Sequence, residues 1–153
     1  MAIIAKKSWN ELGIALPDFK DSGTFLKTCG TIVAKEIVAG IESETTPAGG
    51  PQKQNSPMYA ALKEYTKGYT TPGKGMAPES PYLAKLSTWK RDLVGDKELW
   101  IHANTKRADV VLKLADMGYW FVGITAKAEE LIAKRLYQYL MSKIKKMAAG
   151  KAV

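Results

Sequence analysis

The longest regular pattern of apolar positions lies in the last quarter of the chain. Apolar residues recur there at steps of three and four, which places them along one stripe of a helix of about six turns. The stripe consists of Ala128, Leu131, Ile132, Leu136, Tyr139, Leu140, Ile144 and Met147. Thr125 stands just before it and is a suitable N-cap, because its hydroxyl can accept a hydrogen bond from a free backbone N–H of the first turn. The pattern predicts a long amphipathic C-terminal helix.

A short aromatic and β-branched run at residues 119–122 comes directly before this helix. Such residues fit a pleated, half-buried surface, so the run predicts a strand that leads into the helix. We expect Ile132, Leu136 and Leu140 to be buried against this strand and against a helix near the N-terminus.

That N-terminal helix is predicted over about Asp18–Glu44. Its apolar face is formed by Leu26, Cys29, Val33, Ile37 and Ile41. Gly30 and Gly40 lie inside the pattern, and each costs about 1 kcal/mol relative to alanine in a helix interior. We therefore expect another element to approach the helix closely at these two glycines.

The middle of the chain is rich in glycine, proline and threonine. Residues 45–55 and 69–79 are loops by composition, and a serine–proline pair at 56–57 opens a short helix that ends near Lys67. Loops of this length are uncommon inside a compact domain. We therefore expect the region 45–80 to be a long flexible loop in the isolated subunit.

Three further elements complete the predicted fold. A third helical stripe begins at Ser80 and contains Tyr82, Leu83, Leu86, Trp89 and Leu93. Residues 98–104 alternate as a strand whose two faces are both at least partly covered. Residues 108–117 suit a buried strand or a short helix, and Gly118 as a stop signal favours the helix.

Together the patterns predict an α+β fold in one domain spanning residues 1–153. We expect a small antiparallel sheet of three to four strands, packed on the long N-terminal and C-terminal helices. Residues 1–17 are mixed in character, with Trp9 and Leu12 as the expected apolar anchors.

Composition is consistent with one folded domain. The apolar share of 46% and the charged share of 25% are ordinary for such a domain. No apolar run approaches the ~20 residues that a membrane helix needs, and the first residues lack the pattern of a secretory signal. A single cysteine excludes an internal disulfide and fits a reducing compartment.

The net charge of +8 suggests a further role, because it could attract nucleic acid or an acidic protein surface. All but three of the 23 basic residues are lysine, which argues against base-specific readout by the arginine fork. The candidate electrostatic contact surface on the C-terminal helix comprises Lys134, Arg135, Lys143, Lys145 and Lys146. The plainer interpretation is a solvated helix face.

No pattern predicts catalysis. Residues 68–75 fit the first seven positions of a phosphate-binding loop, but Gly75 stands where a Ser or Thr would hold magnesium, and no strand precedes the segment. His102 is the only histidine and Cys29 the only cysteine, so a zinc site is nearly excluded, and we interpret both as structural. We predict no catalytic residue, no metal and no cofactor.

The order of short motifs resembles one known family. Thr46–Gly50 follows the first helix, residues 56–63 read Ser-Pro-Met-Tyr-Ala-Ala-Leu-Lys, residues 80–86 read Ser-Pro-Tyr-Leu-Ala-Lys-Leu, and Trp120–Thr125 leads into the last helix. This order is similar to that of the small neck and tail-completion (virion morphogenesis) proteins of long-tailed bacteriophages, including Mu-like and lambdoid forms. The similarity covers about residues 18–145 and departs from the family's usual pattern at 84–87 and at 117–119.

The resemblance implies a structural role rather than an enzymatic one. Several copies would form a ring at the head–tail junction, join the connector to the tail and complete it. The expected partners are further copies of the chain, other neck, connector and tail proteins, and DNA through non-specific contact. The expected location is the virion, and the host cytoplasm during assembly.

The resemblance also implies that the 45–80 loop becomes ordered against neighbouring subunits. The candidate inter-subunit residues are Thr46, Pro47, Gly49, Gly50, Tyr69 and Lys74. The alternative function is a basic nucleic-acid-binding protein that uses the lysine-rich C-terminal helix, and an enzyme not evident from the sequence is a third hypothesis.

Overall fold

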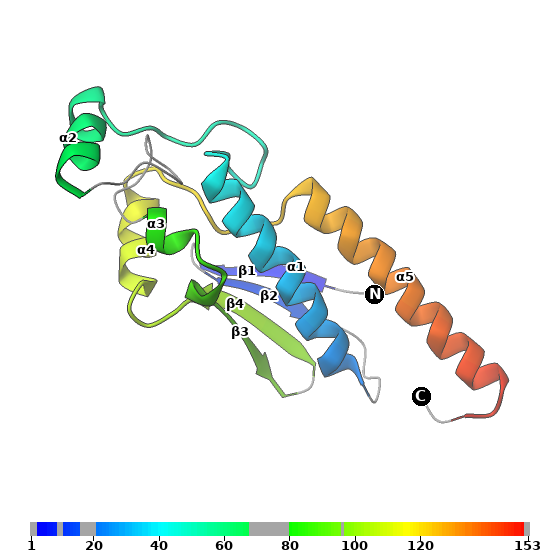
Figure 1. The fold of residues 1–153 in the computed structure, drawn as a ribbon. Coiled ribbons are helices and arrows are strands. Elements are labelled where there is room, and N and C mark those ends of the chain that lie inside the picture. The colour runs from blue at the N-terminus through cyan, green and yellow to red at the C-terminus, as the bar shows by residue number, and fades with distance from the viewer. Residues whose placement is uncertain (1–2, 9–10, 16–20, 68–79, 96, 152–153) are drawn as a thin grey trace.

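A computed structural model describes residues 3–8, 11–15, 21–67, 80–95 and 97–151. The predicted α+β class is confirmed, since a four-stranded antiparallel sheet is packed on helices (Figure 1). The strands are β1 (Ile3–Ser8), β2 (Glu11–Ala15), β3 (Trp89–Val94) and β4 (Glu98–Ala103). The helices are α1 (Ser22–Glu42), α2 (Pro57–Lys67), α3 (Ser80–Leu83), a 3-10 turn at Leu86–Thr88, α4 (Ala108–Asp116) and α5 (Ala126–Ala148).

The sheet joins two hairpins that are distant in sequence. Its strand order is β1-β2-β4-β3, so β2 and β4 meet in the middle and β3 forms one edge. Leu12 of β2 pairs with Ile101 of β4. The strand predicted over 98–104 is confirmed as β4, which ends at Ala103, with Leu99, Ile101 and Ala103 buried. The N-terminal hairpin was not predicted, because the mixed pattern of residues 1–17 indicates no single type of element.

The predicted third helical stripe is wrong beyond its first turn. α3 begins at Ser80 as expected, but the chain then turns and continues as β3 from Trp89. The Trp89 indole N–H donates to the Leu83 carbonyl (2.8 Å), and the Thr88 hydroxyl donates to the Tyr82 carbonyl (2.7 Å). Trp89 and Leu93 are four residues apart, a spacing that fits one helical turn and also one face of a strand.

The predicted strand at residues 119–122 is also absent. This segment has no regular secondary structure, although Tyr119, Phe121 and Val122 are buried as an apolar run would suggest. The helix over 108–117 is confirmed as α4. Gly118, with a φ of 93°, follows it in the left-handed conformation typical of a helix end.

Helix α1 lies directly against the sheet (Figure 1). A Cβ added at Gly30 would stand only 2.2 Å from Leu99 Cδ2, so the predicted close approach at this glycine is confirmed. At Gly40 the corresponding distance, to the Thr45 carbonyl oxygen, is 3.2 Å. Cys29 is fully buried in the core, and burial raises the pKa of its thiol to about 11.

Helix α5 runs beside α1, and only part of its predicted apolar stripe is buried. Ala128 and Ile132 are buried, whereas Leu136 and Leu140 are only half-buried, so the expected burial of these two is corrected. Ile144 and Met147 lie 55% and 59% exposed. The end of α5 is exposed because α1 begins at Ser22, beside Lys143. Beyond that point α5 continues without α1 to cover it.

This division of the stripe predicts a contrast between two isoleucines of α5. Ile132→Ala should lower the free energy of unfolding by about 2–5 kcal/mol, since it leaves a cavity in the core. Ile144→Ala, the matched control, should change it by no more than about 0.5 kcal/mol. Urea denaturation followed by circular dichroism measures both, and equal losses would contradict the arrangement of α5.

Candidate interaction surface

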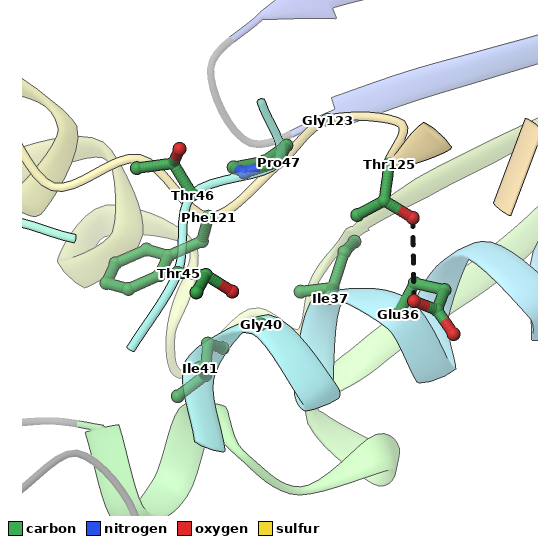
Figure 2. A pocket seen from close by; sticks show the side chains of 10 residues that line it. All are labelled: Glu36, Ile37, Gly40, Ile41, Thr45, Thr46, Pro47, Phe121, Gly123 and Thr125. Carbon is green, nitrogen blue, oxygen red and sulfur yellow. Dashed lines mark hydrogen bonds between the residues drawn. The ribbon is translucent and has the colours of Figure 1, made fainter. Parts of the chain in front are cut away.

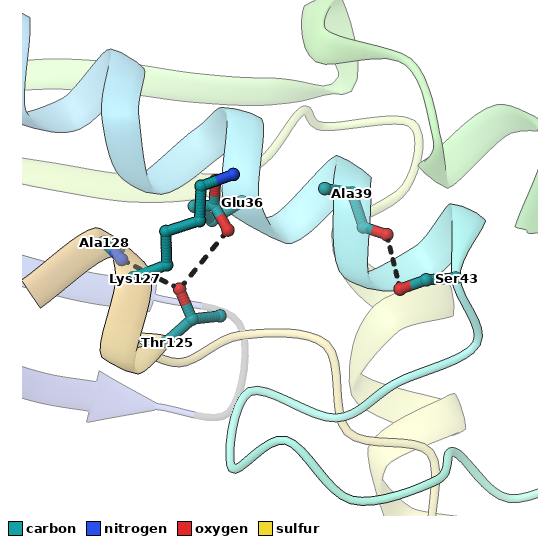
Figure 3. A network of polar contacts seen from close by, with 6 residues as sticks. All are labelled: Glu36, Ala39, Ser43, Thr125, Lys127 and Ala128. Carbon is teal, nitrogen blue, oxygen red and sulfur yellow. Dashed lines mark hydrogen bonds and ion pairs between the residues drawn. The ribbon is translucent and has the colours of Figure 1, made fainter. Parts of the chain in front are cut away.

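Two polar clusters fix α5 on α1. At the start of α5, the Thr125 hydroxyl accepts from the Ala128 N–H (3.0 Å), which confirms the predicted N-cap, and lies 3.5 Å from Glu36 Oε2 (Figure 3). Lys127 Nζ lies 3.2 Å from Glu36 Oε1. Glu36 is thus bonded to both the cap and the first turn of α5, and this sets where the helix begins.

The second cluster lies near the other end of α5. Lys143 forms an ion pair with Asp21, and the Tyr139 hydroxyl donates to the same carboxylate (2.9 Å). The Tyr139 ring stacks on Phe25 with 4.5 Å between ring centroids. The hydrogen bond from Lys143 lowers the pKa of Asp21, and burial raises the pKa of Tyr139.

This cluster corrects one predicted contact residue. Lys143 is only 3% exposed, so it is unsuited to the electrostatic surface to which the sequence assigned it. The other predicted members lie exposed on α5, namely Lys134, Arg135, Lys145 and Lys146. Four of the five predicted contact residues are therefore exposed, while Lys143 holds α5 against α1.

Exposed apolar side chains lie beside these charges. Lys134, Tyr137, Met141, Ile144 and Lys145 follow steps of three and four, so they form one face of α5, here called the outer face. Tyr137 is 67% exposed, and Met141 is half-buried. Tyr137, Met141 and Lys145 also line an open depression of about 530 Å³. This face was not predicted, because the apolar stripe recognised in the sequence does not include Tyr137 or Met141.

Residues 44–52 form a tight turn against the segment that precedes α5. The Thr46 N–H donates to the Gly50 carbonyl (2.8 Å), and Thr45 pairs with Pro51. The Pro47 ring packs so closely on Gly123 that an added Cβ would stand 2.5 Å from Pro47 Cβ (Figure 2). The cavity beside this contact measures about 10 Å³, room for no more than one water molecule.

The side chain of Gln52 explains why residues 119–122 are not a strand. Its amide donates to the Trp120 carbonyl (2.6 Å) and accepts from the Trp120 N–H (3.1 Å). Gln52 is 3% exposed, so both bonds are shielded from water. Nearby, the Tyr119 hydroxyl donates to Asn55 Oδ1 (2.8 Å). A side chain thus satisfies backbone groups that would otherwise require a neighbouring strand.

These contacts involve the first part of the predicted inter-subunit loop, whose docking on neighbouring subunits stays a prediction. Over residues 45–55 the chain finds its partners within the same molecule, and Thr46 and Pro47 line the small cavity. Gly49 is exposed and Gly50 half-buried, both at the turn. Tyr69 and Lys74 lie outside the described residues.

A second exposed apolar face lies on α2, whose predicted start is confirmed by a hydrogen bond from the Tyr59 N–H to the Ser56 hydroxyl (3.3 Å). Met58, Leu62 and Tyr65 are 83%, 53% and 90% exposed and share one side of the helix. The spacing of these three residues is evident in the sequence and would have predicted this face.

The described residues contain no group of three or more His, Cys, Asp or Glu side chains that could hold a metal ion. His102 lies with Nε2 at 2.6 Å from Asp92 Oδ2 and Nδ1 at 2.8 Å from the Ala103 carbonyl, so both ring nitrogens are occupied within the sheet. None of the helices in the described ranges combines the length and the apolar character that a membrane span requires. Comparison of the chain with protein families, curated proteins and solved structures finds no match.

The Gln52 contact predicts a specific loss of stability. Gln52→Leu keeps the approximate volume but leaves the Trp120 N–H and carbonyl without their partner, so it should cost about 1–3 kcal/mol. Gln138→Leu, at an exposed position of α5 far from Gln52, should stay within about 0.5 kcal/mol. Denaturation gives both values, and faster hydrogen exchange at the Trp120 amide should accompany only the first variant. Unchanged exchange there would disprove the assignment.

The Asp21–Lys143 pair predicts a dependence of stability on acid. Because folding lowers the pKa of Asp21 below its ordinary 3.8, its contribution is present above that pH and is lost as pH falls through the folded-state pKa. Asp21→Asn should therefore weaken the decline in stability between about pH 5 and pH 2. Asp116→Asn, an exposed carboxylate on α4, is the control. Equal acid profiles for wild type and Asp21→Asn would contradict the pairing.

Proposed function

We propose that this protein is a structural virion subunit of a tailed bacteriophage, acting at the head–tail junction as a ring of copies that joins the connector to the tail. The order of motifs from Thr46 to Thr125 supports this proposal through its resemblance to neck and tail-completion proteins. The observation that carries it is the outer face of α5, where Tyr137 and Ile144 are 67% and 55% exposed.

The composition of this face favours a protein partner. Large apolar side chains that gather on an exposed surface mark interaction sites more often than isolated ones do. Protein interfaces place apolar and aromatic side chains at the centre and charge at the rim. On the outer face Tyr137, Met141 and Ile144 would supply that centre, and Lys134 and Lys145 would lie at the edge, where charge chiefly affects the rate of association.

Nucleic-acid binding is the second candidate, supported by the four exposed basic residues of α5. Lysine and arginine bind the DNA backbone by releasing condensed counterions, so such binding is indifferent to sequence and weakens steeply with salt. Apolar residues contribute little to that mechanism. We therefore rank protein assembly first and expect only weak, non-specific DNA binding.

Two variants separate the candidates. Ile144→Glu places a charge at the centre of the outer face without touching the core, so it should abolish ring formation and joining to phage tails. Reversal of Lys134, Lys145 and Lys146 to Glu should leave assembly nearly normal. Analytical ultracentrifugation and electron microscopy with purified tails measure both, and circular dichroism confirms that each variant folds.

The opposite result would favour the second candidate. Tight binding to short DNA duplexes at physiological salt, lost in the lysine variant and retained in Ile144→Glu, would identify α5 as a nucleic-acid contact. Lys143 is left unchanged in both variants, because its ion pair with Asp21 would confound stability with function.

A further inference from the structure

A basic notch lies between α1 and the edge strand β3, and the proposed function does not use it. Lys27 and Thr31 contribute from α1, and Arg91 contributes from β3. Together they line a cavity of about 260 Å³. Among the described residues, no carboxylate lines this cavity, to which Lys27 and Arg91 contribute two cationic groups.

The guanidinium of Arg91 is held in place by a neutral group. Its Nη1 donates to the Thr31 hydroxyl (3.2 Å), and that hydroxyl donates in turn to the Lys27 carbonyl (3.0 Å). Because the Thr31 hydroxyl donates its proton to the Lys27 backbone carbonyl, the hydroxyl oxygen is left to accept a hydrogen bond from Arg91. Arg91 is therefore oriented, and within the described part of the chain only one of its five N–H donors has a protein acceptor.

The packing of α1 brings these groups together. At Gly30, between Lys27 and Thr31, an added Cβ would stand 3.5 Å from Arg91 Cγ as well as 2.2 Å from Leu99 Cδ2. The absence of a side chain at Gly30 lets α1 lie close enough to the sheet for Thr31 to reach Arg91. Arg91 is half-buried and Lys27 is exposed, so the notch opens to solvent.

We propose that this notch binds a phosphate group. A guanidinium presents parallel N–H donors that match two oxygens of a phosphate, and a lysine ammonium can engage a third. A cavity of about 260 Å³ has room for a phosphate and the first atoms of an ester. The group could belong to orthophosphate or to a nucleic-acid backbone, which share the chemistry that Lys27 and Arg91 recognise.

Titration of the ¹⁵N-labelled protein with sodium phosphate, against sodium chloride at matched ionic strength, tests the proposal. Saturable shifts at Lys27, Thr31 and Arg91 are expected with phosphate alone. Arg91→Gln should weaken binding at least about tenfold, because it removes charge-assisted hydrogen bonds. Lys35→Gln, an exposed lysine of α1 that does not line the notch, should bind as wild type does.

Two more variants keep the test decisive. Arg91→Lys preserves charge but loses the planar fork, so it should bind more weakly than wild type. Lys27 is exposed, so a loss of phosphate binding in Lys27→Gln cannot be ascribed to unfolding. A titration with a short oligonucleotide distinguishes the source, since saturation at the same three residues identifies the phosphodiester backbone. Absence of saturation with both ligands, or equal affinity in Arg91→Gln and wild type, would overturn the proposal.

Discussion

The close contact between α1 and β4 at Gly30 sets the geometry of the whole molecule. A helix gains stability when glycine is replaced by alanine, yet any Cβ here would overlap Leu99, which is itself fully buried. Glycine therefore weakens α1 locally so that the helix can lie on the sheet. The distance between α1 and the sheet in turn determines where α5 can pack beside α1. It also determines how near Thr31 comes to Arg91.

Elements defined by local chemistry could be predicted from the sequence. α1 and α5 have long apolar periods, Thr125 caps its own helix, and Gly118 ends α4, so each signal lies within a few residues of its effect. The conformation of residues 119–122 could not be predicted from such local signals. Its backbone is bonded by the side chain of Gln52, and a single sequence gives no sign of so distant a partner.

Partners that are distant in the sequence also decide which residues belong to the candidate interaction surface. All five basic candidates on α5 look alike in the sequence, but Asp21, from the far end of the chain, withdraws Lys143 into an ion pair. In the sequence, the apolar residues of α5 form one wide stripe. The position of α1 decides which of them are buried and which are exposed to solvent. Ile132 and Ile144 have the same side chain and opposite surroundings for that reason alone.

The edge strand β3 restricts how copies of this protein can meet. Its outward positions carry Lys90 and Asp92, both exposed, in the middle of the strand. A second β-strand added along that edge would have to bring its own side chains against this alternating pair of charges, and charged edges are a common protection against unintended sheet extension. A contact made through the exposed faces of α2 or α5 needs no backbone pairing, so the charges along the β3 edge do not hinder it.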